Sequence, residues 1–372
     1  MMKTNLNFGL LLFAVFCILY GLIISTKRAE SLGSSLLFLF VAYISWQLSN
    51  FLWNKVTLIP KELVSPFGKA VMITGCDTGF GHILAKRLNK YGFYVYAGCL
   101  FPEGDGANQL RSECADNLHI VKLDVTKDDE IYKAAQEVKE SIGDRKLWAV
   151  VNNAGILISA EIEMGDIQCF DTQMDVNCLG IVRVTKAFLP LLRKAKGRVV
   201  NMASLAGRYS IPGMVAYCMS KAAVISFSDG LRREMKKWDV DVITIEPHLF
   251  KTNLCDDKSQ KSCLLNLWNR TPIDVRQEYG ESYFAGFQTL LDHMLGSARS
   301  KITNVVDTMA IAVTHQSVSP NYLVLGDFER LRICIWNLLP VRVLDLISHL
   351  LCIRYTGKPV FQRSQKTSAK CK

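Results

Sequence analysis

The stretch from Ala70 to Leu88, AVMITGCDTGFGHILAKRL, decides the fold. Its first five residues, Ala70 to Thr74, predict a buried strand, and the residues from His82 onward predict a helix. Between them lies a T-G-x-x-x-G-x-G turn, whose glycines let the backbone pass close to a pyrophosphate at the helix N-terminus, where free N–H groups favour anionic oxygens. A glycine-rich turn alone is a weak signal, but its position between a strand and a helix predicts a dinucleotide site.

Short apolar runs and helical stretches continue to alternate along the chain. The runs are Ala70 to Thr74, Phe93 to Gly98, Leu118 to Leu123, Trp148 to Asn152, Arg198 to Asn201, Asp241 to Ile245 and Tyr322 to Leu325. This alternation predicts a parallel sheet with helices on both faces, which is a doubly wound, Rossmann-type α/β fold. The irregular, polar segment between Phe250 and Gly286 lies where a substrate lid is expected, and two helical stretches lead from it to the last strand.

Residues 1–60 are predicted to anchor the chain in a membrane through one or two apolar helices. Phe8 to Ser25 is an uncharged apolar run of 18 residues, long enough to cross a bilayer. A cleaved signal peptide is the alternative, although the run is long for one and no small-x-small cleavage site follows it. Leu32 to Trp53 is a second uncharged stretch, which either spans or lies in the interface. Basic residues flank every end of these segments, so the orientation stays open.

Residues 65–330 are expected to form one catalytic domain, followed by an apolar and then basic C-terminal extension, residues 331–372. From Leu331 to Arg354 apolar clusters alternate with arginines, which suits either a membrane face or core packing. Beyond Arg354 the tail carries no acidic residue, although the whole chain has a net charge of +10. This basic tail suits an anionic lipid surface better than nucleic acid, and a disordered solubilising tail is the alternative.

Metal chemistry is not expected. The twelve cysteines include no C-x-x-C pair, and the six histidines show no H-E-x-x-H or similar spacing. The sequence therefore predicts neither a metal site nor a disulfide framework.

Tyr217 and Lys221 are spaced i, i+4, so on a helix both side chains project from one face. A phenol has a pKa near 10, and its use as a base near pH 7 requires roughly 4 kcal/mol of help, which a neighbouring ammonium and a cationic nicotinamide ring can supply. Ser204, thirteen positions before Tyr217, follows a predicted strand and is placed to hydrogen-bond the reacting oxygen. Asn177 would complete a proton relay. Each residue alone is more often structural, but their joint order predicts an active site.

The end of the second predicted strand indicates which dinucleotide is bound. A carboxylate there would hold the ribose 2′-OH and an arginine would accept a 2′-phosphate, but the sequence reads Cys99-Leu100. Asp77 and Thr78 in the glycine turn supply no positive charge. The next ionisable groups, Glu103 and Asp105, would repel a phosphate. This pattern favours NAD over NADP.

Over roughly Lys69 to Gly326 the sequence resembles the short-chain dehydrogenase/reductase family. The matching motifs are, in order, Thr74 to Gly81, Asn152 to Gly155, Asn177, Ser204, Tyr217 and Lys221. The resemblance implies that the Asn-Ser-Tyr-Lys set is catalytic, with Tyr217 as proton donor or acceptor, and that Asp124 contacts the adenine side. It implies a cofactor site made by Thr74, Gly75, Thr78, Gly79, Phe80, Gly81, Asp124, Asn152, Ala154, Gly155, Tyr217, Lys221, Pro247 and Thr252.

Three stretches resemble one branch of this family more narrowly: Tyr96 to Leu100, Leu147 to Gly155 and Thr185 to Arg193. The branch holds 17-beta-hydroxysteroid, retinol and D-beta-hydroxybutyrate dehydrogenases, which mostly use NAD and associate with membranes. One departure stands out, because the family's Pro-Gly after the sixth strand is Pro247-His248 here. Glycine allows a close backbone approach to the nicotinamide. His248 either narrows the site, contacts substrate together with Ser204, or is accommodated by a modest loop shift.

The leading hypothesis is a membrane-bound, NAD-dependent dehydrogenase of a lipophilic steroid or retinoid alcohol. A second hypothesis, 3-hydroxybutyrate oxidation, needs a cation for the substrate carboxylate, for which Lys251 and Arg208 are the candidates. A third, from another class, is a membrane-tethered binding protein that keeps the fold without turnover. The resemblance favours the endoplasmic reticulum membrane, with the mitochondrial membrane second, and leaves a homo-oligomer open.

Overall fold

A computed structural model describes residues 14–18, 41–43, 45–46, 62–252, 254 and 256–360. The chain divides into two compact units, Met1–Glu62 and Leu63–Lys372. In the first unit the described residues are short helical pieces. The expected spans Phe8 to Ser25 and Leu32 to Trp53 therefore lie mostly outside the described residues. Among the helices that are described, none combines the length and apolarity needed to cross a membrane.

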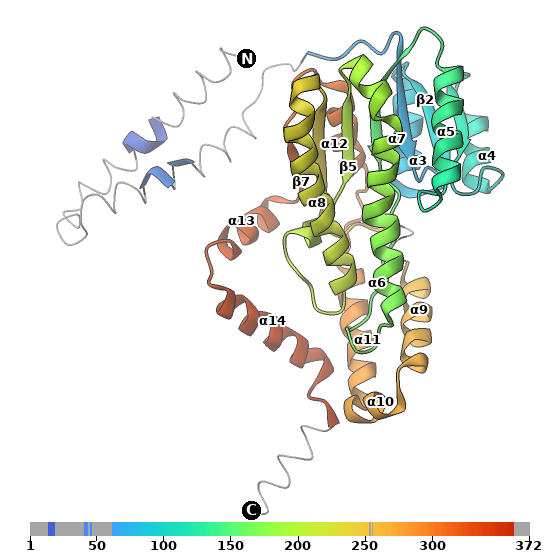
Figure 1. The fold of residues 1–372 in the computed structure, drawn as a ribbon. Coiled ribbons are helices and arrows are strands. Elements are labelled where there is room, and N and C mark those ends of the chain that lie inside the picture. Colours follow the sequence, from blue (N-terminus) through green and yellow to red (C-terminus); the bar gives the residue numbers. More distant parts are fainter. Residues whose placement is uncertain are drawn as a thin grey trace, which may run out of the picture. The chain divides into compact units, whose positions relative to one another are not determined.

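The second unit is built on a seven-stranded parallel sheet of order β3-β2-β1-β4-β5-β6-β7 (Figure 1). The strands are β1 (Lys69–Thr74), β2 (Tyr94–Cys99), β3 (Leu118–Lys122), β4 (Lys146–Asn152), β5 (Arg198–Met202), β6 (Asp241–Pro247) and β7 (Asn321–Val324). All seven predicted strands and the doubly wound fold are confirmed. The chain order reverses between β1 and β4, and a crevice for ligands opens at the carboxyl ends of strands on either side of such a point.

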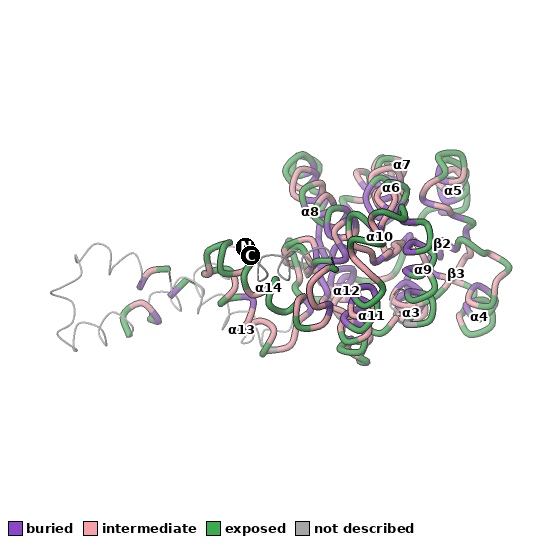
Figure 2. Tube along the Cα trace, turned by 90° about the horizontal axis from the view of Figure 1, so that it is seen from below, coloured by how far each residue is buried: buried purple, intermediate pink, exposed green. Residues whose placement is uncertain are grey.

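Helices cover both faces of the sheet. One face packs α3 (Gly79–Lys90), α4 (Asp105–Glu113) and α12 (Thr303–Thr314) in one apolar cluster. The other packs α5 (Asp128–Ser141), α7 (Gly180–Ala195) and α8 (Val215–Met235) in a second cluster. Figure 2 shows the buried residues gathered between the helices, with exposed residues on their outer sides. Because both faces are covered, the strands read as nearly continuous apolar runs.

A third apolar cluster lies beyond the sheet, where α9 (Asp257–Arg270), α10 (Ile273–Tyr279) and α11 (Glu281–Gly296) come together (Figure 1). Helix α6 (Ile167–Met174) faces α9 across a pocket. The expectation of an irregular segment from Phe250 to Gly286 is wrong, since α9 and α10 form there. Asp256 caps α9 by accepting a hydrogen bond from Ser259 N. Only a narrow stripe of the helix is buried, represented by Leu264, Leu267 and Trp268, so its polar remainder hid the helical period.

Two helices follow the sheet, α13 (Asp327–Trp336) and α14 (Val341–Thr356). Tyr355 and Cys352, near the end of α14, join the third cluster beside α11. The earlier turns of α14 expose large apolar side chains, among them Val343, Leu346 and Leu350.

Candidate active site

The glycine turn forms a cradle at the carboxyl end of β1. Gly75 and Gly79 have φ angles of +68° and +67°, which favour glycine. At Gly81 an added Cβ would lie 2.4 Å from Gly75 O and 2.5 Å from Asn153 Nδ2. The turn therefore stays open to a ligand only with glycine at these positions.

The start of α3 suits an anionic ligand. Thr78 precedes the helix, and among the described residues its side chain makes no capping hydrogen bond and no acidic residue occupies the first turn. The first N–H groups of α3 are thus left for phosphate oxygens, which is the arrangement that a dinucleotide requires. Phe80 packs edge-on against Phe250. Thr252 Cβ lies 4.0 Å from the Cβ position of Gly79, so this predicted residue reaches the turn. The residues present fit a nicotinamide dinucleotide.

The turn after β4 is tied to the turn after β1. Thr74 Oγ1 accepts hydrogen bonds from the backbone N–H groups of Asn153 and Ala154, each at 3.0 Å. Asn153 Nδ2 donates back to Thr74 O and Gly75 O. The predicted residue Asn152 behaves differently, because its side-chain amide donates to Thr185 Oγ1 and Asn201 Oδ1 within the protein interior. Its side chain supports the sheet.

Asp124, expected near the adenine, is half-buried after β3. Its Oδ1 accepts hydrogen bonds from Thr126 N at 2.9 Å and Thr126 Oγ1 at 2.8 Å. This local turn fixes the carboxylate in one orientation. Gly155, at the end of the β4 turn, lies beside the catalytic groups, since a Cβ there would be 3.2 Å from Asn177 Oδ1 and 3.6 Å from Lys221 Nζ.

The Asn-Ser-Tyr-Lys set gathers around this turn. Asn177 lies in a π-helical turn, Asp175–Leu179, that connects α6 to α7. Such insertions often occur at functional sites. The Asn177 side chain accepts a hydrogen bond from Ile156 N at 2.8 Å and donates to Ser220 Oγ at 3.0 Å. Asn177 is fully buried and held from two sides.

Tyr217 and Lys221 lie on α8 as the spacing predicted. Lys221 Nζ is 5.7 Å from the centroid of the Tyr217 ring and donates a hydrogen bond to Met202 O at 2.8 Å. Burial lowers the pKa of Lys221 to about 8, because a charged ammonium loses its hydration there. Ser204 Oγ accepts a hydrogen bond from Ala206 N and lies 3.4 Å from Pro247 O, at the end of β6.

His248, which replaces the family glycine, faces the C-terminal helices. Its Nε2 lies 3.4 Å from Arg332 Nη2 of α13. Burial, and then the neighbouring Arg332, hold the pKa of His248 below its ordinary value. The neutral imidazole is therefore the form that can accept a hydrogen bond from Arg332.

The sequence did not predict the contacts of three residues in this region, Asp77, Arg208 and Glu246. The Asp77 carboxylate accepts hydrogen bonds from the backbone N–H groups of Leu100 and Phe101, both at 2.9 Å, so a negative charge lies at the end of β2. Glu246 and Arg208 form a bidentate ion pair beside Pro247. The available signal for this pair was a carboxylate near the carboxyl end of the mostly apolar strand β6. Since Arg208 is engaged by Glu246, it is a poor candidate for binding a substrate carboxylate.

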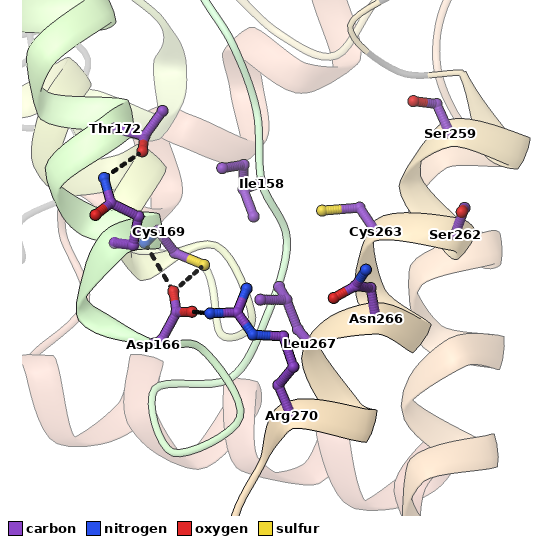
Figure 3. A pocket seen from close by; sticks show the side chains of 11 residues that line it. Ile158, Asp166, Cys169, Thr172, Ser259, Ser262, Cys263, Asn266, Leu267 and Arg270 are labelled. Carbon is purple, nitrogen blue, oxygen red and sulfur yellow. Dashed lines mark hydrogen bonds and ion pairs between the residues drawn. The ribbon is translucent and has the colours of Figure 1, made fainter.

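A pocket of about 510 Å³ opens between α6 and α9 (Figure 3). Asp166 and Cys169 lie on one side and Cys263 and Arg270 on the other, with an ion pair between Asp166 and Arg270. None of the four catalytic residues is among the described residues that line it. Tyr217 instead packs against the third apolar cluster, which α11 and the end of α14 complete.

A glycine cradle and an Asn-Ser-Tyr-Lys set at the carboxyl edge of a doubly wound sheet define a nicotinamide-dependent oxidoreductase. The family model of the short chain dehydrogenases matches residues 69–262. The chain belongs to the short-chain dehydrogenase/reductase family, and it is an alcohol dehydrogenase or ketone reductase of that family.

The chain is similar to named dehydrogenases over most of its length. It is 43% identical to rat (Rattus norvegicus) retinol dehydrogenase 16, covering 71% of this chain and 83% of the relative. It is 39% identical to mouse (Mus musculus) estradiol 17-beta-dehydrogenase 2, covering 77% and 76%. Among solved structures, a short-chain dehydrogenase from Streptomyces avermitilis shares the fold with a TM-score of 0.59 and 22% identity, covering 74% of this chain and 94% of that one.

The buried ammonium predicts a pH-dependent stability. Between pH 8 and 10.5, the values for folded and unfolded Lys221, the unfolded chain binds a proton that the folded chain does not. The unfolding free energy of the wild type, relative to Lys221→Met, should therefore rise with pH across this window and stay level below it. The total rise should be on the order of 3 kcal/mol.

Urea unfolding of both proteins at a series of pH values measures this difference. Lys139→Met, at an exposed position of α5, controls for the loss of a lysine as such. If the unfolding free energy of the wild type relative to Lys221→Met stayed constant or fell between pH 8 and 10.5, burial would not lower the pKa of Lys221.

Proposed function

We propose that this protein is a membrane-bound dehydrogenase that oxidises a lipophilic steroid or retinoid alcohol with NAD, with Tyr217 as the acid/base. The observation that carries the proposal is the position of Tyr217, which has Lys221 on one side and an apolar cluster on the other. The polar side suits proton transfer, and the apolar side suits a substrate poor in polar groups.

Each catalytic side chain has a separate task. Tyr217 takes the hydroxyl proton of the alcohol as the carbon–oxygen bond becomes a carbonyl. The Lys221 ammonium stabilises the tyrosinate by its positive charge. Ser204 donates a hydrogen bond to the reacting oxygen while charge is present on it. Asn177 holds the turn at Ile156 next to these groups. A bound nicotinamide supplies the hydride acceptor.

The substrate class is supported by the apolar cluster and by the relatives. Met214, Phe284 and Phe287 belong to the buried part of the cluster against which Tyr217 packs. Such a surface favours hydrocarbon and offers few partners to a small hydroxy acid. Retinol and estradiol dehydrogenases are among the similar proteins. The pairing of Arg208 with Glu246 further disfavours 3-hydroxybutyrate, for which Lys251 would remain as the cation.

The preference for NAD is supported by Asp77. Its carboxylate lies at the end of β2, against the backbone of Leu100 and Phe101, where a 2′-phosphate would have to approach. The negative charge of the Asp77 carboxylate would repel the negative charge of a 2′-phosphate that approached it. The Asp77 carboxylate is thus a specific charged group that supports the NAD preference predicted from Cys99-Leu100.

Membrane attachment, most consistent with the endoplasmic reticulum, is supported by the apolar run from Phe8 to Ser25 and by the C-terminal extension. The exposed apolar side chains of α14 and the basic residues that follow Arg354 suit a surface of anionic lipid. A lipophilic substrate dissolved in that membrane would reach the enzyme without crossing much water.

Tyr217→Phe tests the mechanism. We expect kcat for oxidation of estradiol or all-trans-retinol to fall roughly 10²- to 10⁴-fold, because the general base is lost. NAD should still bind, because the other residues of the expected cofactor site are unchanged. NADH formation and NAD titration by fluorescence measure the two effects. Tyr322→Phe serves as the control. It removes a phenol hydroxyl on β7 that accepts a hydrogen bond from Ser319 N. Turnover unchanged in Tyr217→Phe would refute the mechanism.

Asp77→Asn tests the cofactor preference. The wild type should use NAD in preference to NADP, and removal of one negative charge should lower KM for NADP by about tenfold. Initial rates with both cofactors measure the ratio, with Asp116→Asn at an exposed loop position as the charge-matched control. Equal use of both cofactors by the wild type would contradict the proposed role of Asp77.

Membrane attachment is tested with the full chain expressed in eukaryotic cells. We expect the protein in the microsomal pellet and its retention there after an alkaline carbonate wash, since apolar spans resist extraction that removes surface-bound proteins. Immunoblotting of pellet and supernatant measures the distribution. Recovery in the soluble fraction before any wash would rule out this part of the proposal.

A further inference from the structure

An ion pair between the exposed Arg208 and the buried Glu246 joins two segments that carry the candidate active site. Glu246 lies in β6 directly before Pro247 and is fully buried. Arg208 ends the short 3-10 helix Leu205–Gly207, which begins immediately after Ser204. Arg208 Nε and Nη2 donate to the two carboxylate oxygens of Glu246, both at 2.8 Å. Thr244 Oγ1 donates a third hydrogen bond to the same carboxylate at 2.9 Å.

The geometry of this pair is more specific than the fold requires. The buried Glu246 carboxylate needs a cationic partner, but any nearby cation would compensate its charge. A bidentate guanidinium–carboxylate contact, by contrast, fixes both distance and orientation between the segments that carry it. Thr244 fixes the Glu246 carboxylate on β6, and the two hydrogen bonds from Arg208 to that carboxylate restrict movement of the turn that carries Arg208.

That turn places Ser204. Ser204 Oγ lies 3.4 Å from Pro247 O and accepts a hydrogen bond from Ala206 N. On its other side the turn packs closely on α8, because a Cβ at Gly207 would lie 2.7 Å from the carbonyl carbon and oxygen of Lys221. The ion pair is therefore the charged link that holds the serine turn against β6, while α8 supports it from behind.

We propose that Arg208 and Glu246 are positioning residues that hold Ser204 at hydrogen-bonding distance from the reacting oxygen of the substrate. This inference rests on the proposed dehydrogenase function. Neither side chain needs to touch substrate or cofactor. A displacement of about 1 Å at a catalytic hydrogen bond is enough to lower a rate by on the order of 100-fold.

Glu246→Gln keeps the shape of the side chain and removes its charge. We expect kcat for the alcohol that the wild type oxidises with NAD to fall roughly 10- to 100-fold, with KM for alcohol and for NAD within about twofold. Arg208→Lys keeps the positive charge but loses the bidentate contact with Glu246. Its kcat should therefore lie between those of the wild type and Glu246→Gln. Because Arg208 is partly exposed, Arg208→Lys also carries the test if Glu246→Gln does not fold.

A double-mutant cycle with Ser204→Ala separates positioning from general damage. If the pair acts through Ser204, Glu246→Gln should lower kcat less than about threefold in the Ser204→Ala background. Asp241→Asn is the matched control. Asp241 in β6 pairs with Arg198 in β5, at the ends of these strands that lie away from Ser204 and Glu246. This substitution should lower the unfolding temperature without changing kcat.

Three outcomes decide the matter. Non-additive effects with Ser204→Ala support the proposal. Independent, multiplicative effects, or a loss of kcat that follows the unfolding temperature in Glu246→Gln and Asp241→Asn alike, would overturn it. A wild-type protein that binds NAD but oxidises none of estradiol, testosterone or all-trans-retinol would refute the proposed function, and the inference with it.

Discussion

The contact between the turns after β1 and β4 is the constraint on which the site depends. Thr74 Oγ1 accepts hydrogen bonds from Asn153 N and Ala154 N at the point where the strand order reverses. This contact joins the glycine cradle to the turn that carries Gly155. Because Gly155 lies against Asn177 and Lys221, the glycine turn is connected to the residues of the predicted catalytic set. A parallel sheet supplies this arrangement because its carboxyl ends all meet at one edge.

The site also buries charge at two points, and each burial has a different consequence. The Lys221 ammonium has one described hydrogen-bond acceptor, Met202 O, and its pKa is lowered because little compensates its lost hydration. The Glu246 carboxylate receives three hydrogen bonds, two of them from Arg208. The poorly compensated ammonium favours a nearby anion, such as the tyrosinate of Tyr217 in the proposed mechanism. The carboxylate is fixed, which is useful for holding a turn.

The sequence predicted the fold and the helix that carries Tyr217 and Lys221, because both depend on local periodicity and short spacing. The stretch from Ala70 to Leu88 contains a strand, a turn and a helix in order, and i, i+4 spacing places Tyr217 and Lys221 on one helix face. It did not predict α9, whose buried stripe is narrow. It also did not predict the contacts of Asp77 with Leu100 and of Arg208 with Glu246, because these partners are 23 and 38 residues away in sequence. Contacts at such separations depend on the tertiary fold, which the local pattern does not encode.

The departure from the family pattern at His248 changes how the C-terminal helices relate to the active site. A glycine at this position could not reach α13, whereas the His248 ring lies 3.4 Å from Arg332 Nη2. Near it, Tyr209 in the loop after the serine turn packs edge-on against Trp336 and donates a hydrogen bond to Asn337. Both contacts join residues beyond 330 to loops that flank Ser204. Helix α13 and the residue after it therefore pack on both loops that flank Ser204, the loop after β6 through His248 and the loop after the serine turn through Tyr209.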